Sequence, residues 1–266
     1  MSFDPYVIFD PLLAGRTGHR LLPELRRYRY AHRGYHDKPQ IPENSMAAFR
    51  RAVARGWGAE FDVHILKDGT LAVFHDSELM RCAGVEGVIE DLDRAGLAKL
   101  RLEGTDEPVP LFDEVLGLFE EAKLPLIIEL KAYKGNHLEL ATAVCERLDR
   151  YTGLFCVESF DPRVVADIKK LRPDFCRGQL AEDFIKNDSD LPGYQQFLLT
   201  NLLFNSSARP DFIAYKYEDR GSRRCRRAVD KLGLQEVSWT IRSKEDLLTA
   251  EADGSIPIFE KFDPDA

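Results

Sequence analysis

The chain has 266 residues, of which 44% are hydrophobic, 10% aromatic and 31% charged, a composition that supports a sizeable core in one large domain. The net charge of −8 argues against a nucleic-acid-binding protein, because such proteins normally carry a basic face. The apolar runs are too short to span a membrane, and the first thirty residues lack the apolar core of a signal peptide. We therefore expect a cytoplasmic protein without stable membrane insertion. The five scattered cysteines contain no CxxC pair, which is typical of reduced thiols rather than of disulfides or a zinc site.

Short β-branched or aromatic runs alternate with longer helical patterns, which predicts βα units around a parallel sheet. We expect strands at Tyr28–Arg33, Ala59–Leu66, Leu71–Asp76, Pro125–Leu130, Leu154–Ser159, Phe175–Leu180, Asp211–Tyr217, Glu236–Ile241 and Ile256–Glu260. We expect helices at Ser45–Arg55, Leu111–Ala122, His137–Tyr151, Asp161–Leu171, Pro192–Leu203, Arg223–Leu232 and Lys244–Glu251. Without the third strand, the parallel strands are as many as a closed (β/α)8 TIM barrel needs, so we predict this α/β fold for a single domain of residues 1–266.

Two segments depart from the alternating pattern. Residues 1–27 form a basic N-terminal extension, which we expect to pack across the bottom of the barrel. Residues 67–110 follow the second strand without an intervening helix, and their Asp68-Gly69 pair is a strong hairpin signal between two β-patterned runs. We expect this hairpin and small insertion to stand above the barrel mouth. Asn44, just before the first long helix, is predicted to be its N-cap.

The hairpin predicts how side chains group across its two strands. With Asp68 and Gly69 as a two-residue turn, His75 lies directly opposite Asp62. Opposed residues point to the same face of a sheet, and Glu60 shares that face because side chains alternate along a strand. Local chain geometry therefore groups two carboxylates with an imidazole.

Two other predicted strands end in charged pairs. The segment 30–34 ends with His32 and Arg33, and the segment 127–131 ends with Glu129 and Lys131. In a barrel of this kind, polar residues at the C-terminal strand ends indicate function. These side chains are therefore predicted to meet at one mouth of the barrel.

Three acids in these segments suggest a cation site. A charge buried at the end of an apolar strand is costly unless it is paired or binds a metal. Glu60, Asp62 and Glu129 together offer only oxygen ligands, which suit a hard divalent cation, Mg²⁺ or Ca²⁺, rather than zinc. The sequence does not distinguish between these two ions.

The segments AHRG, PENS, EFDVHILKDGTLAVFHD and IELK occur here in this order, and together they resemble the glycerophosphodiester phosphodiesterase family. The resemblance runs from about Tyr28 to the C-terminus, and the later SFDP segment and the Trp-Thr strand are also similar. It implies a TIM barrel and metal-dependent hydrolysis of a small-molecule glycerophosphodiester to sn-glycerol 3-phosphate and an alcohol. A cyclic-phosphate route and direct attack by water both remain open.

The resemblance also implies roles for individual residues. It implies that His32 and His75 act as general acid and base. It implies that Glu60, Asp62 and Glu129 bind the metal. Arg33 and Lys131 would hold the phosphate oxygens, and Glu43 would belong to the site. Trp239 either packs against glycerol carbons or is a buried core residue, and Glu43 alternatively stabilises a helix dipole. The chain departs from the pattern at Arg242 and Glu260, and Lys216 has no assigned role.

Two alternative functions remain open at this point. A lysophospholipase D or sphingomyelinase D-like enzyme would act on lipids that keep an acyl chain, and it would need an apolar groove at the barrel mouth. A non-catalytic barrel would only bind a phosphodiester, although such a protein has no need of a pair of proton-transferring histidines. The sequence does not indicate the alcohol group of the substrate or the oligomeric state.

Overall fold

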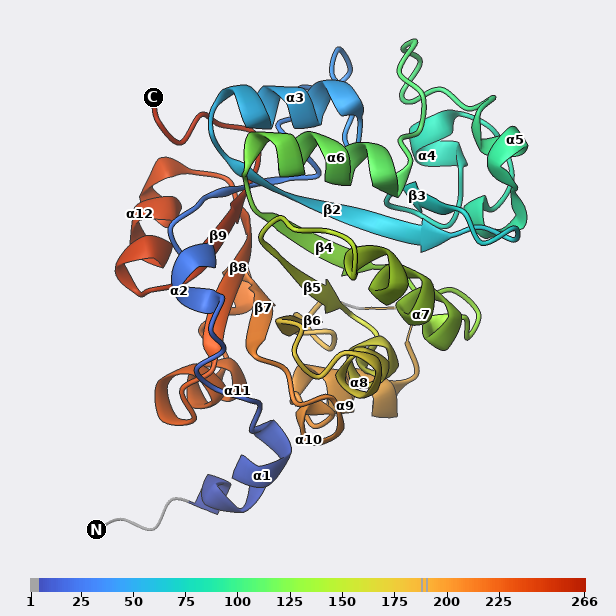
Figure 1. Cartoon of the computed structure of the whole chain (residues 1–266). Helices are drawn as coiled ribbons and strands as arrows, with labels where there is room; N and C mark the ends of the chain where they lie inside the picture. The colour runs from blue at the N-terminus through green and yellow to red at the C-terminus, as the bar shows by residue number, and fades with distance from the viewer. Residues whose placement is uncertain (1–4, 188, 190) are drawn as a thin grey trace.

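The computed structural model describes residues 5–187, 189 and 191–266 (Figure 1). Its strands are β1 Tyr30–His32, β2 Gly58–Ile65, β3 Leu71–Val73, β4 Leu126–Leu130, β5 Phe155–Ser159, β6 Arg177–Ala181, β7 Phe212–Lys216, β8 Gln235–Ile241 and β9 Ile256–Phe259. All except β3 pair in parallel in the order β1-β9-β8-β7-β6-β5-β4-β2, and β1 also pairs with β2, which closes the sheet. The predicted (β/α)8 barrel is confirmed.

Helices surround the sheet, and the longer ones cover its outer face (Figure 1). In chain order they are η1 Pro5–Phe9, α1 Asp10–Leu13, α2 Leu22–Leu25, α3 Met46–Ala54, α4 Met80–Ala83, η2 Ile89–Asp91, α5 Arg94–Leu97, α6 Phe112–Ala122, α7 His137–Leu148, α8 Pro162–Leu171, α9 Gly193–Thr200, α10 Asn205–Ala208, η3 Tyr217–Asp219, α11 Arg223–Arg226, η4 Arg227–Lys231 and α12 Lys244–Ala252. Every helix predicted from the sequence is present. The one expected over residues 223–232 consists of α11 followed by the π-helical turn η4. In the part of the chain described, no helix has both the length and the apolarity to cross a bilayer.

Alternation along the strands separates two apolar layers. Ile127 packs in a cluster with Tyr30 and Phe212 inside the barrel, whereas its neighbours Leu126 and Ile128 pack outward with the covering helices. Side chains of a strand point alternately to its two faces, so residues two positions beyond an inward apolar residue also point inward. The C-terminal end of each strand thereby directs a side chain into the barrel mouth.

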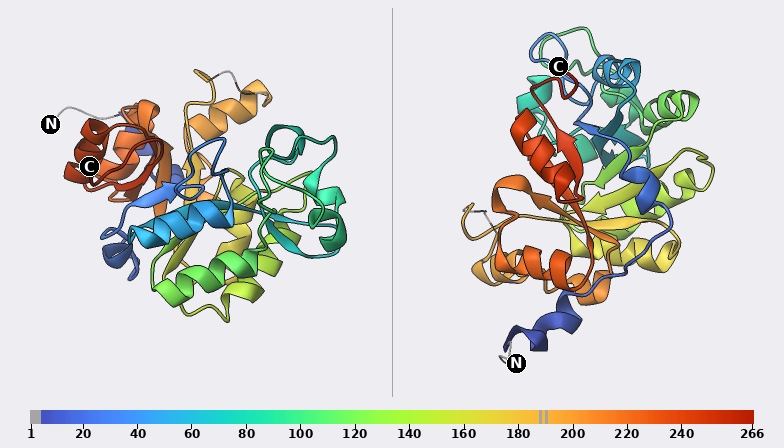
Figure 2. Two further views of the ribbon diagram at one scale, coloured as in Figure 1. Left: turned by 90° about the horizontal axis from the view of Figure 1, so that it is seen from above. Right: turned by 90° about the vertical axis from the view of Figure 1, so that its left-hand side faces the viewer.

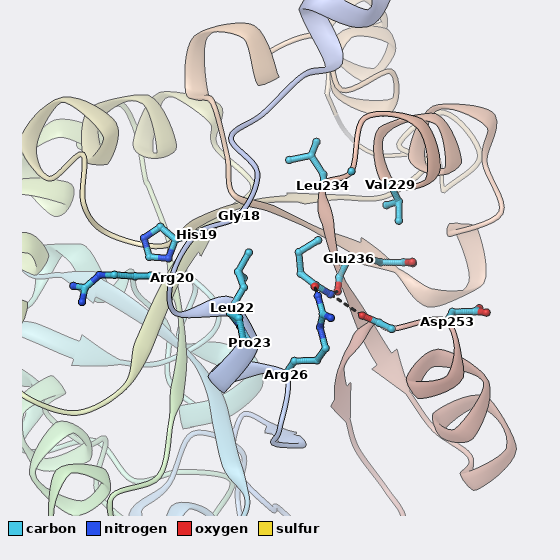
Figure 3. Close-up of a pocket in the computed structure, with 13 residues that line it drawn as sticks. Gly18, His19, Arg20, Leu22, Pro23, Arg26, Val229, Leu234, Glu236 and Asp253 are labelled. Atoms are coloured by element: carbon cyan, nitrogen blue, oxygen red, sulfur yellow. Dashed lines mark hydrogen bonds between the residues drawn. The ribbon is translucent and has the colours of Figure 1, made fainter.

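The N-terminal segment closes the opposite end of the barrel. Leu22 and Leu25 of α2 join the interior apolar cluster, and the Tyr30 hydroxyl donates a hydrogen bond to the Leu25 carbonyl, with an O–O distance of 2.9 Å. This arrangement agrees with the predicted packing across the barrel bottom. A cavity of about 380 Å³ lies there between the segment and β8, and Arg26 and Glu236 are among the side chains that line it (Figure 3). The right-hand view of Figure 2 shows α1 and the C-terminal segment at opposite ends of the molecule.

The insertion of residues 67–110 has an apolar cluster of its own, which includes Phe74, Cys82 and Leu97. Figure 1 shows it beside the C-terminal end of β2, at the barrel mouth. The predicted hairpin register is wrong by one residue. Leu66 donates its N–H to the Thr70 carbonyl, so three residues rather than two form the loop, and the third is a glycine at φ 82°. This is the three-residue hairpin in which a left-handed glycine follows a type I turn.

The predicted cap of α3 is also wrong by one residue. Ser45, not Asn44, is the N-cap, and its hydroxyl accepts the N–H of Ala48 at 3.1 Å. Asn44 instead has φ 53° and donates its side-chain N–H to Asp62, with an N–O distance of 2.8 Å. The amide therefore serves a site residue, while the serine satisfies the helix end.

Candidate active site

The polar residues of the barrel mouth follow from strand alternation. His32 lies two positions beyond Tyr30, and Glu129 lies two positions beyond Ile127, both of which are inward apolar residues. Glu60 and Asp62 occupy inward positions of β2, and Asp62 is in register with Glu129 on β4. The predicted convergence of these side chains at one end of the barrel is therefore present in the structure.

The three predicted metal ligands form a compact group. One carboxylate oxygen from each of Glu60, Asp62 and Glu129 lies within 4.8 Å of the other two, and all three residues are buried. Lys131 Nζ lies 2.9 Å from a Glu129 oxygen and 3.2 Å from an Asp62 oxygen. A fourth buried acid, Glu158, is in register with Glu129 on the neighbouring strand β5.

The surroundings of these acids shift their pKa values in a way that indicates an excess of negative charge. Burial, followed by the charges of neighbouring acids, raises the pKa of Glu60 well above its usual range. Burial likewise raises the pKa of Glu129 to about 7, although Lys131 opposes the shift. Burial opposes ionisation of Asp62 too, but Lys131 and the other nearby cations outweigh it, so the pKa of Asp62 is lowered. The available cations therefore neutralise only part of the group.

The group fits a divalent cation. One oxygen of Glu158 is buried without a hydrogen-bond partner, and Asp62 Oδ1 contacts Lys131 at 3.2 Å without a well-directed hydrogen bond. Such atoms are costly unless a ligand satisfies them. Mg²⁺ and Ca²⁺ take oxygen ligands, and either ion would offset the repulsion among these carboxylates. The acidic group is thus compatible with a divalent cation.

His32 is held by the last strand of the barrel. Its Nδ1 lies 2.8 Å from a Glu260 oxygen, and its Nε2 lies 3.8 Å from a Glu60 oxygen. Because a carboxylate only accepts hydrogen bonds, Nδ1 carries the proton and Nε2 keeps a lone pair toward the mouth. Burial and the charge of Arg33 lower the pKa of His32 from 6.5 to about 4, so the imidazole is neutral at pH 7.

His75 reaches the site from the loop after β3. The corrected register places Phe74 beside Asp62, and the Phe74 N–H donates to the Asp62 carbonyl at 3.1 Å, so the predicted pairing of His75 with Asp62 is wrong. His75 lies beyond the paired strand, and its Nδ1 bonds the carboxylate of Asp76. Burial lowers the pKa of His75, and the charges of Asp62 and Lys131 act on it in opposite directions. The imidazole therefore lies within electrostatic range of the acidic group.

Arg33 links the acidic group to the PENS segment. It has φ 53°, its backbone N–H donates to Glu60 at 3.1 Å, and its guanidinium donates to Glu43 at 2.9 Å. Its Nε lies 3.7 Å from an Asp62 oxygen. Glu43 thus holds the guanidinium beside the barrel mouth.

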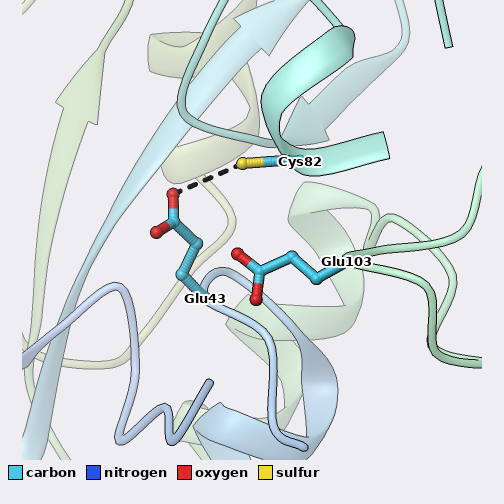
Figure 4. A group of neighbouring side chains, drawn as sticks. All are labelled: Glu43, Cys82 and Glu103. Atoms are coloured by element: carbon cyan, nitrogen blue, oxygen red, sulfur yellow. Dashed lines mark hydrogen bonds between the residues drawn. The ribbon is translucent and has the colours of Figure 1, made fainter. Parts of the chain in front are cut away.

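A second group of potential metal ligands lies next to this one. Glu43, Cys82 and Glu103 approach one another closely (Figure 4). Lys38 contacts both acids, and Arg81 donates to Glu43 at 2.8 Å. These cations neutralise the carboxylates, and the pKa of Glu43 is lowered because they outweigh the effect of burial. The group is accordingly an ion-pair network and has no need of a metal.

Trp239 and Lys216 lie on neighbouring strands and are in register with each other. The Trp239 indole N–H donates to the Ala214 carbonyl at 3.0 Å, and its ring meets Phe160 edge to face at 5.5 Å between centroids. Lys216 Nζ lies 3.0 Å from a Glu182 oxygen. Trp239 is partly buried at the mouth, so it is neither fully exposed nor an interior core residue.

Sequence reasoning missed several residues of the mouth. Glu158 ends an apolar strand as Glu129 does, so the same pattern was available to identify it. Asp76 directly follows His75, but only the folded loop shows their hydrogen bond. Asn44 appeared as a helix cap, and the contact between Glu260 and His32 depends on closure of the barrel.

TIM-barrel enzymes carry their active sites at the C-terminal ends of the strands. The charged mouth of this closed barrel therefore defines the chain as an enzyme of that class. The model of the glycerophosphoryl diester phosphodiesterase family matches residues 32–259, which is most of the chain. The chain belongs to this family and is a phosphodiesterase.

Individual relatives agree with this assignment. A glycerophosphodiester phosphodiesterase of Caldanaerobacter subterraneus subsp. tengcongensis is 32% identical over 241 residues, which cover 85% of this chain and 91% of the relative. Lysophospholipase D GDPD1 of Rattus norvegicus is 37% identical over 122 residues, 41% of this chain and 37% of the relative. The structure of an Oleispira antarctica phosphodiesterase in complex with the product sn-glycerol-3-phosphate shares the fold, with a TM-score of 0.74 and 22% identity, covering 92% of this chain and 95% of that one.

Proposed function

We propose that this chain hydrolyses small-molecule glycerophosphodiesters to sn-glycerol 3-phosphate and an alcohol, with a divalent cation bound by Glu60, Asp62 and Glu129. The observation that carries the proposal is the meeting of this buried acidic group with His32 at one mouth of the barrel. Family membership supports it, as does the Oleispira antarctica phosphodiesterase of the same fold, whose structure contains the product sn-glycerol-3-phosphate. A bound Mg²⁺ or Ca²⁺ would neutralise negative charge on the phosphodiester oxygens as the transition state forms.

The two imidazoles take different parts in proton transfer. His32 is neutral at pH 7 and presents the lone pair of Nε2, so it is the general base that accepts a proton from the nucleophilic hydroxyl. Burial lowers the pKa of His75, although Asp62 and Asp76 oppose this shift and so help the ring to carry a proton. We assign His75 as the second imidazole of the mouth, the general acid that protonates the leaving alcohol. Glu260 and Asp76 fix the Nδ1 proton of each ring, which leaves Nε2 for the substrate.

Cationic side chains complete the substrate site. Arg33 and Lys131 hold phosphate oxygens, and Glu43 acts by positioning the Arg33 guanidinium. The Trp239 ring lies at the edge of the mouth and provides an apolar surface for the glycerol carbons. These contacts recognise the glycerol phosphate half shared by all substrates of this class.

The test is the hydrolysis of glycerophosphocholine with Mg²⁺ or Ca²⁺ by the wild type and by His32→Ala and His75→Ala. Each substitution should lower kcat by about 10²- to 10⁴-fold, the usual contribution of a general acid or base. His137→Ala is the matched control, because His137 lies at the start of α7 and pairs with Asp167 outside the mouth. Glu60→Gln should raise the cation concentration needed for half-maximal rate.

Three results would contradict the proposal. Unchanged turnover in both histidine variants would remove the acid–base roles. Full activity in the presence of EDTA would show that the reaction needs no divalent cation. Normal binding of substrate without any turnover by the wild type would leave a non-catalytic binding protein.

A further inference from the structure

A second pocket opens at the barrel mouth beside β5 and β6. Its volume is about 420 Å³, within the range of about 300–1,000 Å³ that is usual for small-molecule sites. The loops after β5 and β6 and the helices α8 and α9 form its walls. Mostly aromatic and aliphatic side chains line it, including Phe160, Phe184, Leu191, Tyr194, Leu199 and Phe204.

The pocket lies next to the proposed reaction site, and Phe160 connects the two. Phe160 lines it and lies two residues after Glu158, whose carboxylate belongs to the acidic group. The Phe160 ring meets Trp239 edge to face at 5.5 Å on one side and Phe184 at 6.1 Å on the other. Gln179 donates to the Phe160 carbonyl at 3.1 Å and fixes this turn. An aromatic wall thus leads from the mouth into the pocket.

The open side of the pocket is also apolar. Tyr194 is 66% exposed, and Leu191 is 36% exposed although it is aliphatic. Figure 2 shows α9 projecting from the barrel. Apolar side chains that remain exposed in a group are typical of a binding surface, because leaving them in water has a cost in free energy.

The charges of the pocket do not suit a second anionic or cationic ligand. Asp161 and Arg163 are the charged residues among those that line it, and they pair with each other at 2.7 Å between Nη2 and Oδ2. A phosphate or an ammonium group would therefore compete with an existing ion pair. A flexible hydrocarbon needs no polar partner and fits this lining.

We propose that this pocket holds the acyl chain of a lysophospholipid whose phosphodiester lies at the acidic group. The inference rests on the proposed function and extends it to substrates that keep one acyl chain. In the reaction, the bond between phosphorus and the oxygen of the head-group alcohol breaks. Water supplies a hydroxyl to phosphorus and a proton to the alcohol, which yields a monoacylglycerol phosphate and the free alcohol.

Substrate chain length provides a direct test. We would measure kcat/KM for glycerophosphocholine and for its hexanoyl, octanoyl and decanoyl lyso derivatives, each below its micelle-forming concentration. Every methylene that enters the pocket should raise kcat/KM by about three- to fourfold, the equivalent of about 0.8 kcal/mol per CH₂. A kcat/KM that does not change with chain length in the wild type would overturn the proposal.

Two matched variants locate the effect. Leu199→Asp introduces a charge into the pocket wall and should abolish the dependence on chain length, while glycerophosphocholine is still hydrolysed at the wild-type rate. Phe197→Asp adds the same charge to the same helix at a 53% exposed position that does not line the pocket, and it should keep the dependence. Retention of the dependence in folded Leu199→Asp, or its equal loss in both variants, would refute the assignment.

A binding measurement separates this proposal from the proposed function. If the wild type hydrolyses no phosphodiester, the proposed function fails. Calorimetric titration with monomeric decylphosphocholine then tests by itself whether the pocket binds an alkyl chain. Binding to the wild type that Leu199→Asp lacks would support the acyl-chain site. Equal binding to both proteins, or none to either, would overturn it. Activity on lysophospholipid vesicles that is lost only in Phe197→Asp would instead indicate docking on a lipid surface and would also overturn it.

Discussion

The acidic group at the barrel mouth should make the metal-free protein less stable as pH rises. Burial raises the pKa of Glu129 from 4.5 to about 7, so the folded state keeps its proton over a pH range in which the unfolded chain has lost it. The folded state binds more protons, and stability therefore falls between about pH 4.5 and 7 and stays low above that range. The shift corresponds to at most about 3 kcal/mol once the carboxylate is ionised.

Glu129→Gln removes this ionisable group. Between pH 5 and pH 8 in EDTA, the free energy of unfolding of the variant should therefore rise by up to about 3 kcal/mol relative to that of the wild type. Urea unfolding at both pH values measures the difference, and Glu121→Gln, at an exposed position on α6, is the control. Mg²⁺ or Ca²⁺ should restore the wild type at pH 8 and have a smaller effect on the variant. If the difference in unfolding free energy between wild type and Glu129→Gln is the same at both pH values, the electrostatic reasoning is wrong.

Two further substitutions test how the barrel is held together. Glu236→Gln removes a buried carboxylate that accepts hydrogen bonds from Arg220 and Arg226, and it should lower the free energy of unfolding by about 3 kcal/mol because it leaves buried charge unpaired. Urea unfolding checks this value, and a loss in unfolding free energy of less than a few tenths of a kcal/mol would show that water screens the network. Gly178→Ala would place a methyl group 2.0 Å from the Phe212 ring inside the barrel. It should cost about 1–3 kcal/mol through overpacking, measured as a lower thermal midpoint, and an unchanged midpoint would contradict the close approach.

Much of the fold was accessible from the sequence because barrel strands and helices form from local patterns. Alternating runs located all nine strands to within a few residues among the residues that the structure describes, and the Asp-Gly pair located the hairpin. The hairpin register was not accessible, because Asp68-Gly69 is compatible with two-residue and three-residue loops. A slip of one residue turns every side chain to the other face, which is why the expected partner of His75 was wrong.

The sequence by itself placed His32, Glu60, Asp62 and Glu129 at strand ends, since their positions follow from alternation along single strands. Only the tertiary structure decided what lies next to them. His32 and Glu260 are 228 positions apart and come together because β1 pairs with β9 as the sheet closes. Contacts of this kind, like the apolar pocket beside Phe160, depend on elements that are distant in the chain, and no local pattern encodes such a distance.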